Sequence, residues 1–552
     1  MTSYDSYKYS ETETLLRGTR WAEEEEIMRV TRKIRLSDPK CEIHSGLPVI
    51  SDGDTVYLDD SDAHSLIIGS TGSKKTRLFA MPMLNIMRRA GESVVVTDPK
   101  GELYDLTAQA FENSGYRVYV VNLREPRRSN GWNPLALARK YWKAGNLERA
   151  TVIINDFAAT MIPDQPRAKD PFWDQTSRAL LQGLAMLLVE GEDIFPDETV
   201  NLATLRYLSN NLSQLVSDYR HDAFRELLKL YPEDSLAVSN LRVALGGSER
   251  TFDNIRVSYD ASLQHMYIMK SLIAMLSRQD VDFSRLGMEK TVLYLIMPDE
   301  KTTLHAIVSM LIKQCYEHLI DMAQHCKGNT LPQRVNFLLD EFSNLPPIPD
   351  MPAMISAARS RNIKFFLIIQ GLYQLSSKYG SDNAHTIKGN CVNWAFLTSR
   401  ELPLLQEISD LCGQDALTGE KLITPTQLQR LNKEKGEVLI LLGRQYPFIA
   451  HLADISEYHM EKLPRRPFPE IKEKVPPVRY ILQELEEKER DIFDIEGIEE
   501  IELDSPDEAL DGGEEDTDFP DVESELDARM EQLYFEEEEK AERRRKKRKK
   551  DD

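Results

Sequence analysis

Eight consecutive residues have types and spacing that suit the binding of phosphate groups. They follow the pattern GxxxxGK[ST], which places a nucleotide-loop lysine at Lys75 and a magnesium-binding hydroxyl at Thr76. In such a loop, backbone N–H groups and the start of the following helix surround the phosphates. An ordinary basic turn between a strand and a helix is the alternative. The eight residues are Gly69, Ser70, Thr71, Gly72, Ser73, Lys74, Lys75 and Thr76.

Lys74 is the one departure from this pattern, because it stands where the pattern has its second glycine. A side chain at this position must be accommodated in a tight loop. The same side chain adds a positive charge beside the expected phosphates. We therefore expect Lys74 to influence the rate of any hydrolysis at this site.

Two acids, Asp340 and Glu341, close an apolar run about 265 residues after the loop. In a nucleotide hydrolase, Asp340 would hold Mg²⁺ through water and Glu341 would polarise the attacking water. Pairs of acids are also common as solvated strand ends, and this alternative stays open. Together with the loop, the pair predicts a site for ATP and Mg²⁺.

Four further polar residues lie at the ends of expected strands. Gln370 ends the run KFFLIIQ, at a height where a side chain can sense the terminal phosphate of a nucleotide; a polar strand cap is the alternative. Arg359 and Arg361 precede the same run, and either could act across a subunit boundary as an arginine finger. An ordinary solvated basic loop is as good an interpretation for them. Asp98 ends another apolar run, where helix capping is the alternative.

The elements that must position these residues alternate between strand and helix. Short buried runs at residues 64–68, 93–97 and 116–122 are typical of strands, and amphipathic stretches at 77–89 and 102–114 are typical of helices. Such spacing predicts βαβ units, a mainly parallel sheet and a site at the C-terminal ends of its strands. We also expect a weak helix over 21–35 and short strands over 47–58.

The pattern changes in the middle of the chain, where long helical segments at 173–189, 240–244 and 252–276 predict an all-helical insertion. Strand signals return afterwards. The expected later elements are strands over 291–296, 335–339, 365–369, 392–398, 437–442 and 446–451, with a helix over 304–326. The expected domains are an N-terminal segment 1–45, a nucleotide-binding domain in two parts 46–133 and 284–455, an all-alpha domain 134–283, and a linker and acidic tail 456–552 ending in a basic run.

Charge is concentrated in that tail. The chain of 552 residues has a net charge of −22, but residues 481–540 alone carry 27 acids against 4 bases, and residues 1–480 are close to neutral. The low isoelectric point therefore does not argue against a body that binds nucleic acid. The final 12 residues carry 8 bases. This run suits phosphates or anionic lipid headgroups, or it is a solvated tail that folds back on its acidic neighbour.

The sequence also bears on location. Its 5 cysteines are scattered, which favours a reducing compartment and excludes a disulfide framework or a zinc site. It contains no run of 18 apolar residues and no secretory signal at its N-terminus, so we expect a soluble, cytoplasmic chain.

Taken together, six motifs resemble the coupling ATPases of type IV secretion and conjugation, the TraG/TraD class. The resemblance covers roughly residues 15–455, and the order and spacing of the motifs carry it. Even LLRGTRWAEEEEI resembles the stretch that follows the membrane anchor in this family. The six motifs are LIIGSTGSKKT, VVVTDPKGELYD, DPFWDQTSRALLQGL, VNFLLDEFSNLPPIPDM, SRNIKFFLIIQ and RLNKEKGEVLILLGRQYPFIAHL.

The resemblance implies a homo-hexameric RecA-like P-loop motor with a helical domain at its cytoplasmic mouth. Such proteins receive a relaxase–DNA complex, in which we expect single-stranded DNA, and couple it to the membrane channel. Lys75 and Thr76 would then be nucleotide-loop residues, Asp340 and Glu341 the second motif, and Gln370 the strand-end glutamine. Most members of this family begin with a membrane anchor, which this sequence lacks. Either a separate small membrane protein supplies it at the inner face of the membrane, or the chain is a truncated form or a soluble variant.

Two other interpretations stay open. One is a related ring translocase that moves chromosomal DNA, against which the helical insertion argues. The other is a docking receptor that binds nucleotide with little or no hydrolysis, in which Lys74 distorts the loop and the acidic tail recruits basic partners. The presence of both Asp340 and Glu341 argues against the receptor, since a site without turnover needs no water-activating acid.

Overall fold

The computed structural model describes residues 18–38, 41–163, 171–212, 223–245, 249–267, 269–298, 304–415, 418–458, 463–471 and 476–495. Contacts divide the chain into a unit Met1–Arg490 and a second unit Asp491–Asp552. The fold described below belongs to the first unit. The predictions made for the acidic segment beyond residue 495 and for the final basic run lie outside the described residues.

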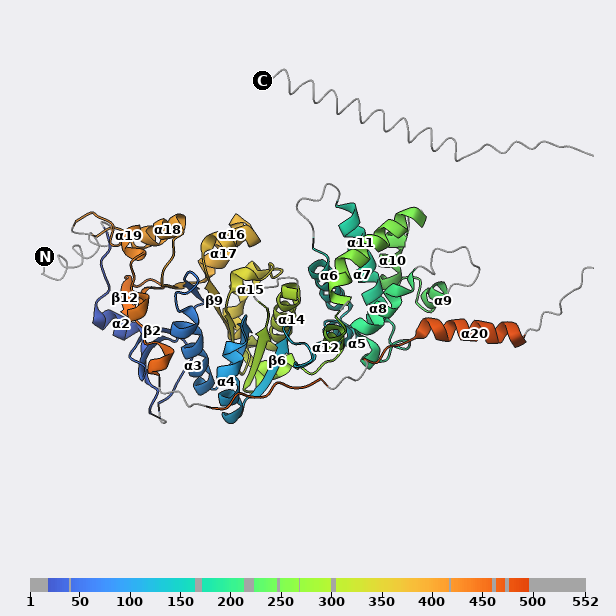
Figure 1. The fold of residues 1–552 in the computed structure, drawn as a ribbon, viewed down its shortest axis with the longest axis horizontal. Helices are drawn as coiled ribbons and strands as arrows, with labels where there is room; N and C mark the ends of the chain where they lie inside the picture. The colour runs from blue at the N-terminus through green and yellow to red at the C-terminus, as the bar shows by residue number, and fades with distance from the viewer. Residues whose placement is uncertain are drawn as a thin grey trace, which may run out of the picture. The chain divides into compact units, whose positions relative to one another are not determined.

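A sheet of nine strands forms the centre of the α/β part of the described fold, beside which the helical region lies (Figure 1). Seven neighbouring strands are parallel, and β11 and β12 continue the sheet as an antiparallel pair at one edge. This confirms the expected α/β class. In order across the sheet, the strands are β12 (Phe448–His451), β11 (Glu437–Leu442), β10 (Asn393–Phe396), β4 (Ser65–Ile68), β9 (Ile363–Ile369), β8 (Val335–Leu339), β5 (Ser93–Asp98), β7 (Thr291–Ile296) and β6 (Arg117–Asn122).

The parallel strands read as continuous apolar runs because both faces of the sheet are covered. Successive side chains of one strand enter different cores: Leu66 and Ile68 of β4 join one cluster, while Ile67 joins the other. Helices pack against the sheet and place their apolar faces in these cores. They are α3 (Met81–Ala90), α4 (Glu102–Asn113), α14 (His305–Gln324), α15 (Met351–Ala358), α16 (Leu372–Tyr379), α17 (Ser381–Asn390), α18 (Leu402–Cys412) and α19 (Pro425–Leu428).

Between β6 and β7, the described residues form helices and no strand. Helices α7, α10 and α11 pack side by side (Figure 1), and the close approach of α7 to α10 uses Gly183, where a Cβ would lie 2.6 Å from Leu241 Cγ. The helices are α5 (Ala136–Lys143), α6 (Leu147–Met161), α7 (Phe172–Glu190), α8 (Leu202–Asn210), α9 (Ala223–Lys229), α10 (Leu236–Leu245), α11 (Glu249–Tyr267), α12 (Lys270–Leu276) and α13 (Phe283–Met288).

The expectation of one helix over 21–35 was wrong. Helix α2 (Glu24–Val30) ends early, and β1 (Arg32–Arg35) pairs with β3 (Thr55–Asp59) in a separate three-stranded sheet with β2 (Leu47–Ser51). Pairing with β3 buries Ile34 almost completely, so a tertiary contact overrides the local helical pattern.

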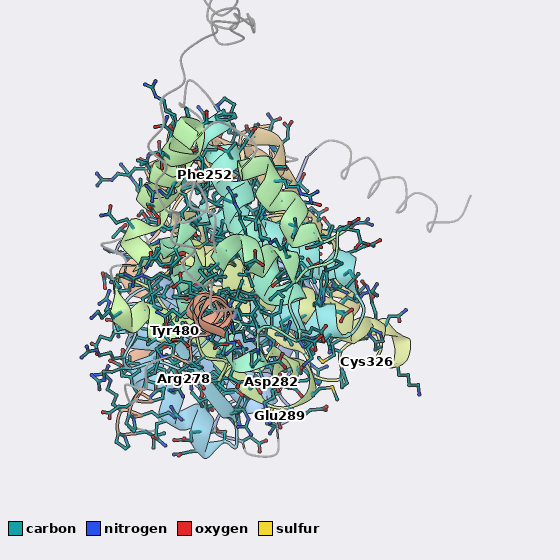
Figure 2. The ribbon with its side chains drawn as sticks, turned by 90° about the vertical axis from the view of Figure 1, so that its right-hand side faces the viewer. Phe252, Arg278, Asp282, Glu289, Cys326 and Tyr480 are labelled. Atoms are coloured by element: carbon teal, nitrogen blue, oxygen red, sulfur yellow. The ribbon has the colours of Figure 1, made fainter. Side chains whose placement is uncertain are left out.

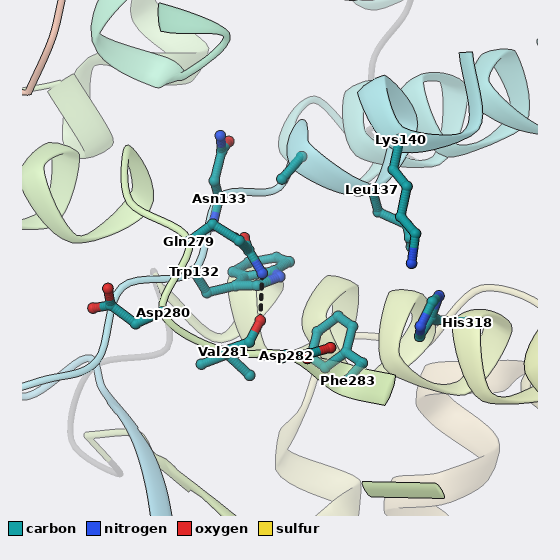
Figure 3. A pocket seen from close by; sticks show the side chains of 11 residues that line it. Trp132, Asn133, Leu137, Lys140, Gln279, Asp280, Val281, Asp282, Phe283 and His318 are labelled. Carbon is teal, nitrogen blue, oxygen red and sulfur yellow. Dashed lines mark hydrogen bonds between the residues drawn. The ribbon is translucent and has the colours of Figure 1, made fainter. Parts of the chain in front are cut away.

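The two chain crossings between the helical region and the sheet run beside each other. Trp132 N donates to Met275 O at 3.1 Å, and Gly131 N donates to Asp280 Oδ2 at 2.7 Å. A pocket of about 190 Å³ lies at this crossing, where Lys140 and His318 point into the same space (Figure 3). The two connecting segments are therefore hydrogen-bonded to each other where the chain passes between the sheet and the helical region.

The segment after residue 462, expected to be a linker, packs on both regions. Phe468 stacks on Tyr104 of α4 with ring centroids 4.5 Å apart. Further along, Asn201 Nδ2 donates to Pro477 O at 2.8 Å, and Tyr480 packs edge-on against Tyr207. Figure 2 shows Tyr480 beside the final helix α20 (Ile481–Ile495). Within the described ranges, no helix has the length and apolar character needed to cross a bilayer.

Candidate nucleotide-binding site

The phosphate-loop motif lies between β4 and the helix that follows it, as the sequence predicts. Gly69 N donates to Ile369 O at 3.1 Å and Ser70 N donates to Thr398 O at 2.9 Å, so the loop is fixed to the ends of the two neighbouring strands. A Cβ at Gly69 would lie 2.4 Å from Ser73 Oγ, so a larger residue here would displace the Ser73 side chain. The loop therefore has a defined backbone path.

Lys75 points back into the loop. Its side chain is 6% exposed, and Nζ donates to Gly69 O at 2.7 Å. The same nitrogen lies 3.7 Å from Glu341 Oε1. Thr76 begins a short π-helical turn, Thr76–Ala80, which continues into α3. Pro82 at the start of α3 has no N–H to donate, and Met81 N donates instead to Thr76 O, which widens the first turn.

Asp340 is buried at the end of β8. Thr97 Oγ1 donates to its backbone oxygen at 2.7 Å, and Glu341 N donates to its Oδ1 at 3.0 Å. Burial, with the neighbouring Glu341 charge, raises the pKa of Asp340 to about 7, while Lys75 acts in the opposite direction. A buried carboxyl with this pKa is readily ionised by a cation placed beside it.

Glu341 is held in a fixed position by amide groups on both sides. Its backbone has φ +52°, a left-handed conformation that is uncommon for a residue with a side chain. Gln370 Nε2 donates to Glu341 Oε2 at 2.8 Å, and Asn344 Nδ2 donates to the same oxygen at 3.2 Å. Thr71 Oγ1 donates to Gln370 Oε1 at 3.2 Å, which links the carboxylate to the loop. Sequence reasoning missed Asn344, although its place three residues after Glu341 was a usable signal.

Lys74 adopts a left-handed conformation, with φ +67°, so it has the backbone geometry that the pattern reserves for glycine. For a residue with a Cβ, this conformation costs about 1–2 kcal/mol. Its Nζ forms an ion pair with Glu434 Oε2 at 2.5 Å. Lys433 Nζ donates to Gly72 O at 3.2 Å. Neither Lys433 nor Glu434 was expected to lie at the loop.

Two of the remaining candidates lie elsewhere. Arg359 precedes β9, whose far end pairs with the residues next to the loop. Seven strand residues at about 3.3 Å each separate it from the loop, roughly 20 Å within one chain. Arg361 occupies the same turn and donates to Asn329 O at 3.3 Å. Asp98 accepts from Gly101 N and Tyr104 N, each at 2.8 Å, so it stabilises the start of α4, as the capping alternative proposed.

A wide cavity of about 1150 Å³ opens beside the first half of the loop. Ser70, Thr71 and Gln370 form its inner wall. Arg400, Arg430 and Lys433 supply three positive charges, Glu401 supplies one negative charge, and Tyr373 in the same lining is 74% exposed. Among the described contacts, Arg400 and Arg430 form no ion pair. The cavity is thus basic and includes an aromatic ring.

Known proteins share much of this sequence. The chain is 26% identical over 398 residues to the conjugal transfer protein TraG of Escherichia coli, covering 68% of this chain and 58% of TraG. It is 23% identical over 424 residues to protein VirD4 of Rhizobium radiobacter, covering 70% of this chain and 56% of that protein. The chain thus spans less than two thirds of the length of these relatives.

Solved structures show the fold. The plasmid coupling protein TrwB in complex with ADP and Mg²⁺ superposes with a TM-score of 0.58 at 16% identity, covering 82% of this chain and 96% of TrwB. The complex of TrwB with the non-hydrolysable analogue ADPNP gives a TM-score of 0.57. A family model described as "Type IV secretory system Conjugative DNA transfer" matches residues 19–444. Since that match spans well over half of the sequence, the chain belongs to this family of conjugative DNA-transfer proteins.

Proposed function

We propose that the protein is an ATP-dependent coupling protein that recruits a relaxase–DNA substrate to a type IV secretion channel and drives its transfer. One observation carries the proposal: Lys75, Asp340, Glu341 and Gln370 come from three separate parts of the chain and converge at one edge of the sheet. The TrwB complexes with ADP and Mg²⁺ and with ADPNP support ATP and Mg²⁺ as the ligands of this edge.

The loop supplies the binding of the nucleotide. Lys75 exchanges its bond to Gly69 O for the phosphates of ATP, and the backbone N–H groups that follow Gly69 donate to the same oxygens. The Thr76 hydroxyl and the Asp340 carboxylate would hold Mg²⁺, and these oxygen donors fit the preference of that ion. Bound Mg²⁺ supplies charge neutralisation at the transferring phosphoryl group.

Glu341 polarises the water that attacks the terminal phosphate. Its bonds from Gln370 and Asn344 fix the carboxylate direction without neutralising it, because both partners are uncharged amides. Gln370 also accepts from Thr71, so a change in the loop on hydrolysis alters the position of Glu341. In this way, the strand-end glutamine senses the state of the nucleotide.

Arg359 serves a neighbouring subunit. It is exposed and lies about 20 Å from the loop of its own chain, so a catalytic role requires a second copy. A homo-hexameric ring places such an edge against the loop of the next subunit, where an arginine stabilises the charge of the transition state.

The cavity beside the loop suits single-stranded DNA. Arg400, Arg430 and Lys433 are of the type that contacts phosphates, and Tyr373 offers a ring on which a base can stack. Gln370 borders the same cavity, which brings DNA next to the residue that senses the nucleotide. This juxtaposition supports DNA-stimulated hydrolysis.

The remaining assignments concern partners and place. In our proposal, residues 46–133 and 284–455 form the RecA-like motor, and residues 134–283 form an all-alpha domain that contacts the relaxase or other substrate proteins. The segments 1–45 and 456–552 flank them. The channel components and a small membrane protein would hold the ring at the inner face of the cell membrane.

Transfer of DNA between cells tests this function. A donor strain that carries the wild-type chain should transfer a mobilisable plasmid, and donors with Lys75→Ala or Glu341→Gln should lose transfer by at least about a hundredfold. Glu420→Gln, which removes an exposed carboxylate away from the loop, should transfer normally. Normal transfer by both site variants would refute an ATP-driven role.

A docking receptor without turnover is the second candidate, and the Lys74–Glu434 ion pair favours it, because the pair occupies one side of the loop. The same transfer experiment separates the two candidates. A receptor needs Lys75 for nucleotide binding but does not need Glu341, so Glu341→Gln would then transfer as well as wild type.

A further inference from the structure

Three contacts join the phosphate loop and its helix to the C-terminal hairpin of the sheet. Lys433 Nζ donates to Gly72 O at 3.2 Å, and Lys74 Nζ pairs with Glu434 Oε2 at 2.5 Å. In the first turn after the loop, Arg77 Nε donates to Asp454 Oδ2 at 2.8 Å. The hairpin residues come from the turns just before β11 and just after β12. The loop is therefore held from outside as well as by its own backbone.

The turn that carries Glu434 is itself rigid. Asn432 Oδ1 accepts from Glu434 N at 3.0 Å and from Lys435 N at 3.2 Å, and Glu437 Oε2 accepts from Asn432 N at 2.8 Å. Gly436 follows with φ +66°, and a Cβ there would lie 2.0 Å from Leu452 O. The backbone that carries Glu434 is thus held in place, and the Glu434 side chain reaches Lys74 from a fixed position.

We propose that Glu434 is a positioning residue for nucleotide binding: through its ion pair with Lys74, it holds the loop in the left-handed conformation that a glycine would adopt unaided. The inference rests on the proposed function, because it assumes that the loop binds ATP. Glu434 acts through Lys74 and has no contact with the phosphates in this role. This positioning role explains how a chain with lysine at the glycine position retains a phosphate-binding loop.

Two opposing effects follow from the loss of this carboxylate. A loop released from Glu434 populates other backbone conformations, since a residue with a Cβ disfavours positive φ, and ATP must then reorder it on binding. A released Lys74 also leaves its ammonium group free to attract phosphate. We expect the reordering to dominate, because free exposed ammonium groups are solvated and screened by salt.

The test compares four forms of the full-length protein: wild type, Glu434→Gln, Lys74→Gly and the double variant. The readouts are the Kd of a fluorescent ATP analogue with Mg²⁺, the KM for ATP and kcat. Glu434→Gln should raise Kd and KM roughly fivefold, because the free-energy cost of the left-handed conformation of Lys74 would then reduce the affinity for ATP. It should change kcat less than about twofold. Glycine needs no tether, so in the Lys74→Gly background the same change should alter Kd less than about twofold.

Two control variants accompany the series. Lys435→Gln lies in the same turn but does not contact the loop, and Glu420→Gln removes one exposed carboxylate elsewhere. Both should bind ATP as wild type does. Thermal unfolding of each variant checks that the fold is retained.

Unchanged or tighter binding by Glu434→Gln would overturn the inference, and so would an equal loss in the Lys74→Gly background. Failure of the proposed function is a different result: wild type would bind no ATP, or Lys75→Ala would bind it equally well. A loss in Glu434→Gln that glycine at position 74 rescues is the outcome that a merely structural role for Glu434 would not produce.

Discussion

Gln370 bonds to both Thr71 of the phosphate loop and Glu341, which follows the neighbouring strand β8, at 3.2 and 2.8 Å. Its amide thus accepts from the loop hydroxyl and donates to the carboxylate. Because an amide has distinct donor and acceptor ends, this arrangement fixes its orientation. A single side chain therefore connects the part of the site that binds phosphate to the part that activates water.

Removing this connection should affect turnover more than binding. We expect Gln370→Ala to lower kcat about tenfold to a hundredfold, because Glu341 loses a partner that orients it, and to change the Kd for ATP by less than about threefold. Steady-state hydrolysis and nucleotide titration measure the two effects. Gln109→Ala, on α4, is the control, since its side chain bonds only within its own helix. A variant with normal kcat would show that Glu341 needs no orientation from Gln370.

Mutation of the basic cavity beside the phosphate loop should change the affinity for single-stranded DNA. Arg430→Gln should weaken binding of single-stranded DNA, and the slope of log affinity against log salt should become shallower by about 0.7 for one lost phosphate contact. Arg444→Gln is the matched control. Arg444 follows the end of β11, which pairs with the start of β10, and therefore lies at the amino ends of the parallel strands, opposite the cavity. Fluorescence anisotropy over a salt series gives both slopes. An unchanged slope in Arg430→Gln would place the DNA elsewhere.

The buried side chain of His64 should make the stability of the fold depend on pH. Its Nε2 donates to Ile355 O at 2.8 Å and its Nδ1 accepts from Phe365 N at 3.0 Å, and burial lowers its pKa to about 4. Below pH 6.5, the unfolded chain takes up a proton that the folded chain excludes until about pH 4, so this contribution to stability is lost as the pH falls through that window.

The wild type should therefore lose about 2 kcal/mol of unfolding free energy from His64 between pH 7.5 and pH 5. Asp98 and Asp340, whose pKa values burial raises to about 6 and 7, contribute with the opposite sign. The informative quantity is thus the difference between wild type and His64→Gln, measured by urea unfolding. That difference should shrink as the pH falls, and a constant difference would show that His64 does not titrate in this way.

The C-terminal segment should contribute to the stability of the sheet region. The Phe468 ring stacks on Tyr104, and the guanidinium groups of Arg128 and Arg465 lie 5.1 and 5.0 Å from its centroid. Phe468→Ala should reduce the unfolding free energy by about 3 kcal/mol. Leu411→Ala, at a position 54% exposed, should change it by less than about 0.5 kcal/mol. A neutral Phe468→Ala would mean that the segment is only loosely attached.

Much of the sheet could be predicted from the sequence. Residues 291–296, 335–339 and 437–442 were expected as strands and are strands with those bounds. Strands that are buried on both faces have apolar residues throughout, so in the sequence they stand out as short apolar runs between polar residues. The meeting of Lys75 with Glu341 was also predictable, since the carboxyl ends of parallel strands share one edge. The domain boundaries and the catalytic roles stay predictions.

Other features had no local signal. Glu434 lies 360 positions after Lys74 in an exposed turn, and nothing in its neighbourhood marks it as part of the loop. The run at 32–35 continued a helical pattern, and only its pairing with β3 makes it a strand. Phe468 stands among prolines and charges that are typical of a linker, although its ring is buried. Each of these depends on a partner distant in sequence.

Steady-state ATP hydrolysis by the full-length protein tests the central claim most directly. Wild type should hydrolyse ATP faster when single-stranded DNA is present. Lys75→Ala should lose both binding and hydrolysis, while Glu341→Gln should bind ATP and fail to turn it over. Hydrolysis that persists in both variants would contradict the account, because the activity would then not arise from the site that these residues form.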